Sequence, residues 1–338
     1  MPSSSSPLLV ITAKNGYVRN NHSWVLDRIM RDYDGWADAA VKKRLNEMLD
    51  ERHAYLQAKV GKDSAVPRPG QTGLCVSIYE SSTEQVAGEP TRNLTYWSGL
   101  ATVVIQLAIA TISVVRLHDW GIMLVTIVGI TLTFITGALP QWRDEKWPCR
   151  RGSHNTYILT RGNGAQHASI ILGNGKGLNL EDMATDGQMQ APTSRLPTRI
   201  CLATLSVLWV GLLIAAAGLR TNTWLLLAIG GIGMAQNVLV AGWRCDPSSL
   251  GMHLDFRGVI GEMAAMDTLL AVEASFPSAG TSLLPIFFPG KLLPHEVEQW
   301  DALDARTEEE RARIQKEGRY AHCPKEGWNA HAKTCEKK

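Results

Sequence analysis

Four long uncharged stretches constrain this chain more than any other feature. None of them contains Asp, Glu, Lys, Arg or His, and each is 19 to 21 residues long: 97–115, 120–139, 200–219 and 223–243. A helix needs about 20 residues to cross a hydrocarbon core about 30 Å thick. Because a soluble protein rarely buries four such helices without one charge, the stretches predict a four-pass α-helical membrane protein. Two short connections pair them into two transmembrane hairpins, 97–139 and 200–243.

The distribution of Lys and Arg predicts the orientation. The connection 141–199 contains eight of these residues, whereas the short hairpin connections contain only Arg116 and Arg220. Lys and Arg gather on the cytosolic side of membrane proteins. The middle loop and both termini are therefore expected in the cytosol, in a membrane whose organelle the sequence does not identify. Residues 1–11 lack a basic leader and a long apolar run, so we do not expect them to form a signal peptide.

The polar remainder predicts a small cytosolic α+β part, built from the middle loop and the C-terminal region. In the N-terminal region, 1–96, we expect helices over 23–30 and 34–60 and a linker over 62–92. In the loop 140–199, Asn163-Gly164 lies between two β-rich runs, 156–160 and 165–172, which predicts a β-hairpin. The region 244–319 predicts a strand at 253–260 and helices at 263–274 and 294–318. Residues 320–338 are expected to be disordered.

No known catalytic or metal-binding motif is complete. The glycine-rich run 173–177 lacks the first glycine of a Walker loop, because that position is Ile170, and no Ser or Thr follows Lys176. His295-Glu296 lacks the second histidine of a zinc-protease motif. The His and Cys residues near the C-terminus fit no common zinc spacing. The sequence thus assigns no catalytic, cofactor-binding or metal-binding residue and predicts no cofactor, which weighs against an enzyme without excluding one.

A basic cluster follows the second apolar stretch: Arg143, Lys146, Arg150 and Arg151. Such a cluster attracts anionic headgroups by about 1 kcal/mol per charge. The alternative is that these residues only fix the topology, which already requires basic side chains there. The net charge of +2 is too balanced to indicate nucleic-acid binding.

The apolar stretches contain few polar or closely packing positions. Three amide side chains need internal partners, because lipid offers none: Gln106, Gln236 and Asn237. Four small residues at helical spacing permit close helix contact: Gly211, Ala215, Gly231 and Ala235. We expect the small residues to form a contact between the third and fourth stretches, and the amides to line the helix bundle.

Five segments resemble a group of uncharacterised multi-pass membrane proteins from filamentous fungi. They are residues 137–151, 159–167, 171–182, 266–273 and 288–292. The resemblance covers about residues 95–300 and does not include the N-terminal part. It implies an integral membrane protein of fungal type, and it assigns no catalytic residue.

Three functions remain open. The favoured one is a non-catalytic membrane scaffold or adaptor that binds a cytosolic protein partner. The second is a small transporter or channel, which would have to form a homo-oligomer because four helices enclose little space. The third is a membrane-bound enzyme in which His167, His253 and Asp255 cluster on the cytosolic sheet.

Overall fold

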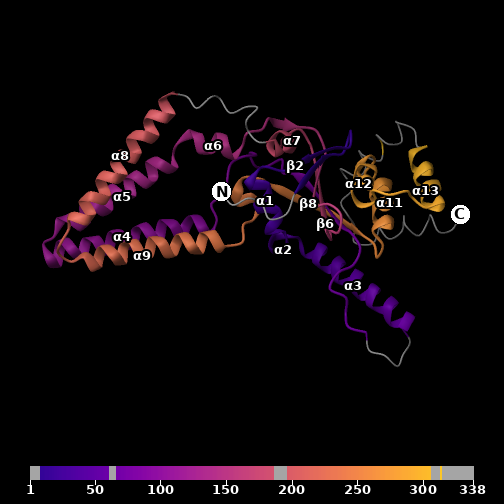
Figure 1. Ribbon diagram of the computed structural model, residues 1–338, viewed down its shortest axis with the longest axis horizontal. Coiled ribbons are helices and arrows are strands. Elements are labelled where there is room, and N and C mark those ends of the chain that lie inside the picture. Colours follow the sequence, from indigo (N-terminus) through magenta and orange to yellow (C-terminus); the bar gives the residue numbers. More distant parts are fainter. Residues whose placement is uncertain (1–7, 61–65, 186–195, 306–312, 314–338) are drawn as a thin grey trace. The chain divides into compact units, whose positions relative to one another are not determined.

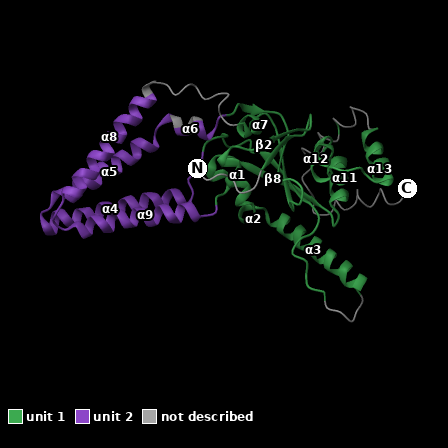
Figure 2. Ribbon diagram, in the orientation of Figure 1, with its two compact units in different colours: residues 1–89, 149–186, 245–338 green, residues 90–148, 187–244 purple. Residues whose placement is uncertain are grey.

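The computed structural model describes residues 8–60, 66–185, 196–305 and residue 313. The chain forms two compact units (Figure 2). Unit 1 contains Met1–Glu89, Cys149–Asp186 and Cys245–Lys338, and unit 2 contains Pro90–Pro148 and Gly187–Arg244. Unit 1 is therefore built from three segments that the two apolar hairpins separate along the chain.

Unit 2 consists of four long apolar helices and one short helix. The long ones are α4 (Leu94–Leu117), α5 (Trp120–Gly137), α8 (Leu196–Gly218) and α9 (Thr223–Gly242), and the short one is α6 (Pro140–Lys146). All four long helices are apolar and long enough to cross a bilayer, which confirms the predicted number of candidate spans. The Asn93 side chain caps α4 and the Asp119 side chain caps α5.

The helices of unit 2 pair across the hairpins. Helix α4 packs along α9 and α5 packs along α8, as Figure 1 shows, while α4 and α5 also contact each other. Near the two turns, Ala110, Ile122, Leu225 and Ile229 form a small buried cluster. Beside it, Thr221 Oγ1 donates to Asp119 Oδ2 at 2.9 Å, which ties one turn to the other.

Unit 1 is an α/β unit around a six-stranded sheet. The sheet strands are β1 (Leu9–Thr12), β2 (Tyr17–Asn20), β3 (Cys75–Ser81), β5 (Tyr157–Thr160), β6 (His167–Leu172) and β8 (Leu254–Gly261). Their order is β2-β1-β5-β6-β3-β8, with β3 parallel to β6 and the other neighbours antiparallel. Two short strands, β4 (Arg151–Ser153) and β7 (Gly177–Leu178), pair separately.

Helices cover both faces of this sheet. The N-terminal segment contributes α1 (Trp24–Arg31), α2 (Tyr33–Trp36) and α3 (Ala39–Val60), and the middle segment contributes α7 (Leu180–Ala184). The C-terminal segment contributes α10 (Pro247–Leu250), α11 (Ala265–Ser275), α12 (Ala279–Phe287) and α13 (Pro294–Asp304). The main core lies between one sheet face and α11 to α13, around Val76, Ile78, Ile170, Leu269 and Leu283. On the other face, Val41 and Met48 of α3 pack near Cys75.

The structure corrects the prediction that 62–92 is a linker. This stretch contains β3, which lies between β6 and β8 and is buried along almost its whole length. The N-terminal region is therefore not a separate helical region, because it supplies three of the six sheet strands. Its strands were missed because β3 is buried on both faces and so lacks the alternation that marks a half-exposed strand.

Several local predictions are confirmed. Helices α1, α3 and α11, strand β8 and the β5–β6 hairpin lie close to their expected positions. The hairpin turn differs in detail, because Gly162 (φ 86°) and Gly164 (φ 83°) adopt positive φ while Asn163 does not. The helix expected at 294–318 ends earlier, because α13 stops at Asp304 with Ala305 as its C-cap. The disorder expected at 320–338 lies outside the described residues.

Candidate functional site

A row of four aromatic rings lies on the sheet face that carries α2 and α3. The Trp36 centroid is 4.9 Å from that of Tyr33 and 5.3 Å from that of Tyr79. The Tyr79 ring is in turn 5.7 Å from Phe256 of β8. Edge-on and tilted contacts at these distances are the favourable geometries for aromatic pairs. The row thus connects α2 with β3 and β8.

Buried hydroxyl groups hold the row onto the sheet. Tyr33 donates its hydroxyl hydrogen to Ser77 Oγ at 2.7 Å, and Ser77 Oγ lies 3.0 Å from Ser169 Oγ. Burial raises the pKa of Tyr33 well above its usual range and also raises the pKa of Tyr79. Both phenols therefore stay neutral at physiological pH, and Tyr33 serves as a hydrogen-bond donor to the central strand.

His167 lies at one end of the row. Its ring centroid is 5.1 Å from that of Tyr33, and its Nε2 is 3.9 Å from Oδ1 of the exposed Asp34. Its Nδ1 is buried with no hydrogen-bond partner among the described residues. Burial lowers the pKa of His167, although the Asp34 carboxylate acts in the opposite direction. His167 is therefore neutral near pH 7.

An open hollow of about 400 Å³ adjoins the row, and we call it the acidic hollow. It is lined by Trp36, Asp38, Tyr79, Asp246, Pro247, Ser248, Met252, Leu254, Asp255 and Phe256. All of these residues belong to unit 1, and they come from the end of α2 and the residues before α3, from β3, from the segment around α10, and from the start of β8. Its volume is in the range typical of small-molecule and side-chain binding sites.

The charged side chains in the described lining of the acidic hollow are all acidic. Asp38, Asp246 and Asp255 contribute three carboxylates, and the described lining contains no Lys, Arg or His. Asp38 accepts a hydrogen bond from the Ala40 amide at 2.8 Å, while Asp246 makes no side-chain cap to α10. Among the described residues, no three acidic, His or Cys side chains converge as they would around a metal ion. Spread carboxylates beside aromatic rings are suited to an organic cation, such as a Lys or Arg side chain.

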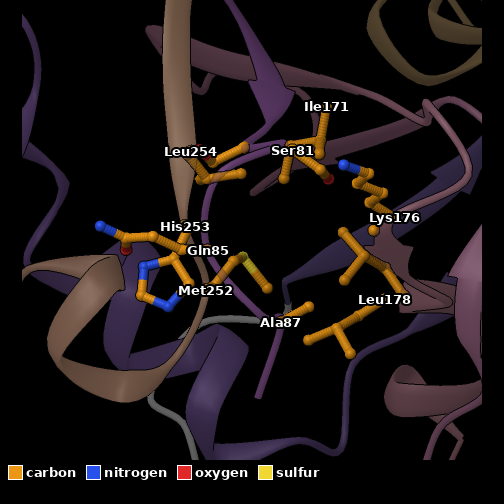
Figure 3. A pocket seen from close by; sticks show the side chains of 12 residues that line it. Ser81, Gln85, Ala87, Ile171, Lys176, Leu178, Met252, His253 and Leu254 are labelled. Carbon is orange, nitrogen blue, oxygen red and sulfur yellow. The ribbon is translucent and has the colours of Figure 1, made fainter. Parts of the chain in front are cut away.

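A second cavity, shown in Figure 3, holds only about 20 Å³. Ser81, Lys176, His253 and Leu254 are among its lining residues. The Nε2 atom of His253 lies 2.8 Å from the Glu89 carbonyl oxygen, and its buried Nδ1 has no partner among the described residues. The volume corresponds to roughly one water molecule. This cavity is therefore the size of a hydration site.

The glycine-rich run beside this cavity is closely packed. A Cβ atom built on Gly173 would lie 2.3 Å from the Asn155 carbonyl oxygen, and one on Gly175 would lie 2.5 Å from the His154 ring. Lys176 Nζ donates to the Thr83 carbonyl oxygen at 2.9 Å. The glycines here permit close approach of neighbouring chain segments, as glycines in a turn at the end of a strand commonly do.

The three residues of the enzyme hypothesis do not come together. His167 pairs with Cys75 at the start of β3. The His253 backbone carbonyl oxygen instead accepts from the Ser82 amide, just beyond the end of β3. Seven residues of strand separate these positions by about 23 Å. Asp255 lies opposite Glu80, near the second histidine only.

The expected basic cluster is divided. Arg150 and Arg151 belong to unit 1, and the Arg150 guanidinium binds both oxygens of Asp182, with Nε–Oδ2 at 2.7 Å and Nη2–Oδ1 at 3.0 Å. Although partial burial opposes it, the hydrogen bonds and charge of Arg150 lower the pKa of Asp182. Lys146 lies 5.5 Å from the Trp147 ring centroid, and the Arg143 side chain lies outside the described atoms. Arg150 is thus paired with Asp182 although its side chain is 71% exposed, and contact of the cluster with lipid stays a prediction.

The three membrane amides have different surroundings. Gln106 Nε2 donates to the Ile229 carbonyl oxygen at 3.0 Å, and Gln236 Nε2 donates to Ser98 Oγ at 2.8 Å. Both bonds join α4 to α9. Asn237 is exposed on the outside of the bundle. The amides therefore do not line one common path.

The predicted contact between the third and fourth stretches is also corrected. Gly211, Ala215, Gly231 and Ala235 are all exposed, and nothing lies within 4 Å of a Cβ built on either glycine. The main neighbour of α9 is α4 and that of α8 is α5. Among the glycines of α8 and α9, the closely packed one is Gly233, where a Cβ would lie 2.9 Å from Gln106 Nε2. The small-residue pattern alone did not indicate which glycine has a neighbour.

Sequence reasoning missed the acidic hollow. Its residues lie at distant positions in the chain, and it forms only because β8 pairs with β3. The one available signal was the concentration of Trp36, Asp34 and Asp38 before a long helix. No family model, curated protein or solved structure matches this chain.

Proposed function

We propose that this chain is a membrane-anchored adaptor. Its four apolar helices cross a bilayer, and unit 1 lies in the cytosol, where the acidic hollow binds a basic segment of a partner protein. The observation that carries the proposal is the hollow itself, in which three carboxylates without a basic neighbour in the described lining border the aromatic row. A Lys or Arg side chain gains both charge pairing and cation–π contact in such a place.

The connectivity supports the membrane part of the proposal. The sheet combines strands from before α4, from between α5 and α8, and from after α9. These three segments have to be on one side of a bilayer to form one sheet, and two hairpins that each cross twice satisfy that condition. The excess of Lys and Arg in the middle segment favours the cytosolic side. The resemblance to multi-pass proteins of filamentous fungi agrees with this placement and stays a prediction.

A transporter or channel is the second candidate, and the structure gives it less support. Transport through the bundle would need polar groups along a shared path. Gln106 and Gln236 instead bond α4 to α9, and Asn237 lies on the outer surface. The adaptor therefore remains the better explanation of the described residues.

Binding is tested with the full-length protein in nanodiscs and a pair of fluorescent peptides. One peptide carries four Arg residues and two Ser residues, and the other replaces each Arg with neutral citrulline. We expect the Arg peptide to bind and the combined Asp38→Asn, Asp246→Asn and Asp255→Asn variant to weaken its binding at least tenfold. The control combines Asp50→Asn, Asp267→Asn and Asp301→Asn, which changes the net charge equally at exposed sites outside the hollow.

Equal loss in both triple variants would mean general electrostatic attraction and would overturn the hollow as the binding site. The membrane side is checked separately in sealed vesicles from the expressing cells. A protease added from the cytosolic side should cleave tags at both termini. Protection of either tag would contradict the orientation without bearing on the hollow.

A further inference from the structure

Asn237 is a polar side chain of α9 that its own bundle leaves without a partner. It is exposed, and the described residues include no hydrogen-bond partner for its side chain. Its neighbour Gln236 is engaged, because it donates to Ser98 Oγ of α4. Successive residues of a helix differ in direction by about 100°, so Asn237 points away from the α4 contact.

The depth of Asn237 makes this exposure unfavourable in a membrane. It precedes Trp243 by six residues, which is about 9 Å along the helix axis. Trp243 stands at the end of α9, where an indole marks the membrane–water interface. An asparagine side chain is too short to reach water over that distance, and hydrocarbon offers it neither donor nor acceptor. The amide therefore requires a partner from outside the bundle.

The surface around Asn237 is formed by exposed apolar and small residues. Residues three, four, seven and ten positions away share its side of α9, and we call this the Asn237 face: Leu227, Gly230, Met234, Asn237 and Ala241. Leu227 and Met234 are 77% and 70% exposed. Nothing lies within 4 Å of a Cβ built on Gly230. Small residues on both sides of an amide permit the close helix approach that hydrogen bonding across helices needs.

We propose that a second copy of this chain packs on the Asn237 face, so that α9 forms a symmetric dimer contact. Two copies inserted with the same orientation place Asn237 at the same depth. An amide is both donor and acceptor, so each Asn237 Nδ2 donates to Oδ1 of the partner's Asn237. A two-fold axis along the membrane normal generates this reciprocal pair from one face. A different membrane protein would satisfy the amide only with a polar group at the same depth, whereas a second copy supplies one by construction.

The first test measures the monomer–dimer equilibrium of the full-length protein in lipid vesicles. Copies labelled with donor or acceptor dyes are diluted over a range of protein-to-lipid ratios, and energy transfer gives the dissociation constant. We expect a dimer for the parent, and a rise in the dissociation constant of about tenfold for Asn237→Val. Asn237→Gln keeps the amide and should restore much of the dimer. Gln236→Leu should destabilise the α4–α9 pair but leave the dimer.

The second test locates the contact by cysteine cross-linking in the membrane. Met234→Cys and Ala241→Cys lie on the Asn237 face, whereas Ala235→Cys lies on another side of α9 and serves as the matched control. Oxidation should link two copies through positions 234 and 241, above the background of the native cysteines, and not through 235. A monomeric parent would overturn the proposal. So would a dimer that Asn237→Val leaves unchanged, or cross-linking that is equal at 235.

Discussion

At the scale of single residues, unit 1 buries polar groups where an apolar core would be simpler. Tyr33, Ser77 and Ser169 form a hydrogen-bonded set between α2, β3 and β6. Buried polar groups of this kind are costly when unpaired, so they specify which partners must meet. His167 stands at the edge of this set with an unpaired Nδ1 and with Asp34 nearby. Its charge state therefore affects how well α2 stays packed on the sheet.

We expect His167 to make unit 1 less stable at mildly acidic pH. Burial lowers the pKa of His167 in the folded protein below the ordinary value of 6.5, so the unfolded chain binds the proton more readily. The contribution of neutral His167 to the free energy of unfolding is therefore fully present above about pH 6.5, and it decreases as the pH falls toward the pKa of the folded state. We expect His167→Gln to reduce the loss of melting temperature between pH 7 and pH 5.

Thermal unfolding of the detergent-solubilised protein, followed by intrinsic fluorescence, measures this effect. His295→Gln, an exposed position at the start of α13, should leave the pH dependence unchanged. An identical pH profile for His167→Gln and the parent would show that other groups cause the acid sensitivity.

At the scale of helices and strands, the sequence predicted the elements that have a local pattern and missed those that depend on contacts between distant segments. The four apolar helices and the β5–β6 hairpin follow from local patterns, namely uncharged length and an Asn-Gly turn. Strand β3 and helix α12 could not be predicted from local patterns, because β3 is buried on both faces and α12 contains Pro285 in its interior. The acidic hollow and the helix pairs of unit 2 depend on which distant elements meet. Gln106 and Gln236 were identified from sequence as amides needing partners, but not as one α4–α9 contact.

The α4–α9 pair should be sensitive to Gly233 and insensitive to Gly231. In Gly233→Ala the new Cβ would lie 2.9 Å from Gln106 Nε2, so the bond from Gln106 to the Ile229 carbonyl oxygen would be distorted or lost. Such interhelical bonds contribute about 0.6 to 2 kcal/mol. In Gly231→Ala nothing lies within 4 Å of the new atom, and alanine is the better helix former.

We therefore expect a lower melting temperature for Gly233→Ala and an unchanged or slightly higher one for Gly231→Ala. Loss of monodispersity on heating in detergent, measured by size-exclusion chromatography, ranks the two variants against the parent. A larger loss for Gly231→Ala would mean that α9 packs through the face that contains Gly231 and Ala235.

At the scale of the whole molecule, unit 1 is one folding unit made from three separated segments. Strand β3 joins β6 of the middle segment to β8 of the C-terminal segment, and β1 pairs with β5. The core between the sheet and α11 to α13 likewise includes residues from all three segments. No segment has a complete sheet of its own among the described residues.

Deletion of residues 1–89 should therefore unfold what remains of unit 1. The deletion removes β1, β2 and β3, so β6 and β8 lose the strand that lies between them. We expect limited proteolysis to cut within 149–185 and 245–305 at sites that are protected in the full chain, with the peptides identified by mass spectrometry. A fragment of the middle segment that stays protected would show that the β5–β6 hairpin is stable without β3.

The position of β3 in the chain also determines when during synthesis its neighbouring strands become available. A ribosome makes β3 before the first apolar hairpin, but the strands on its two sides come only after the first and the second hairpin. About 170 residues separate Ser81 from Leu254, which at about 5 to 20 residues per second corresponds to about 10 to 30 s. Until β6 has been made, β3 has neither neighbouring strand, and its other edge stays unpaired until β8 has been made. In the proposed membrane topology, the sheet can be completed only after both hairpins have been made and the segments that flank them lie on one side of the bilayer.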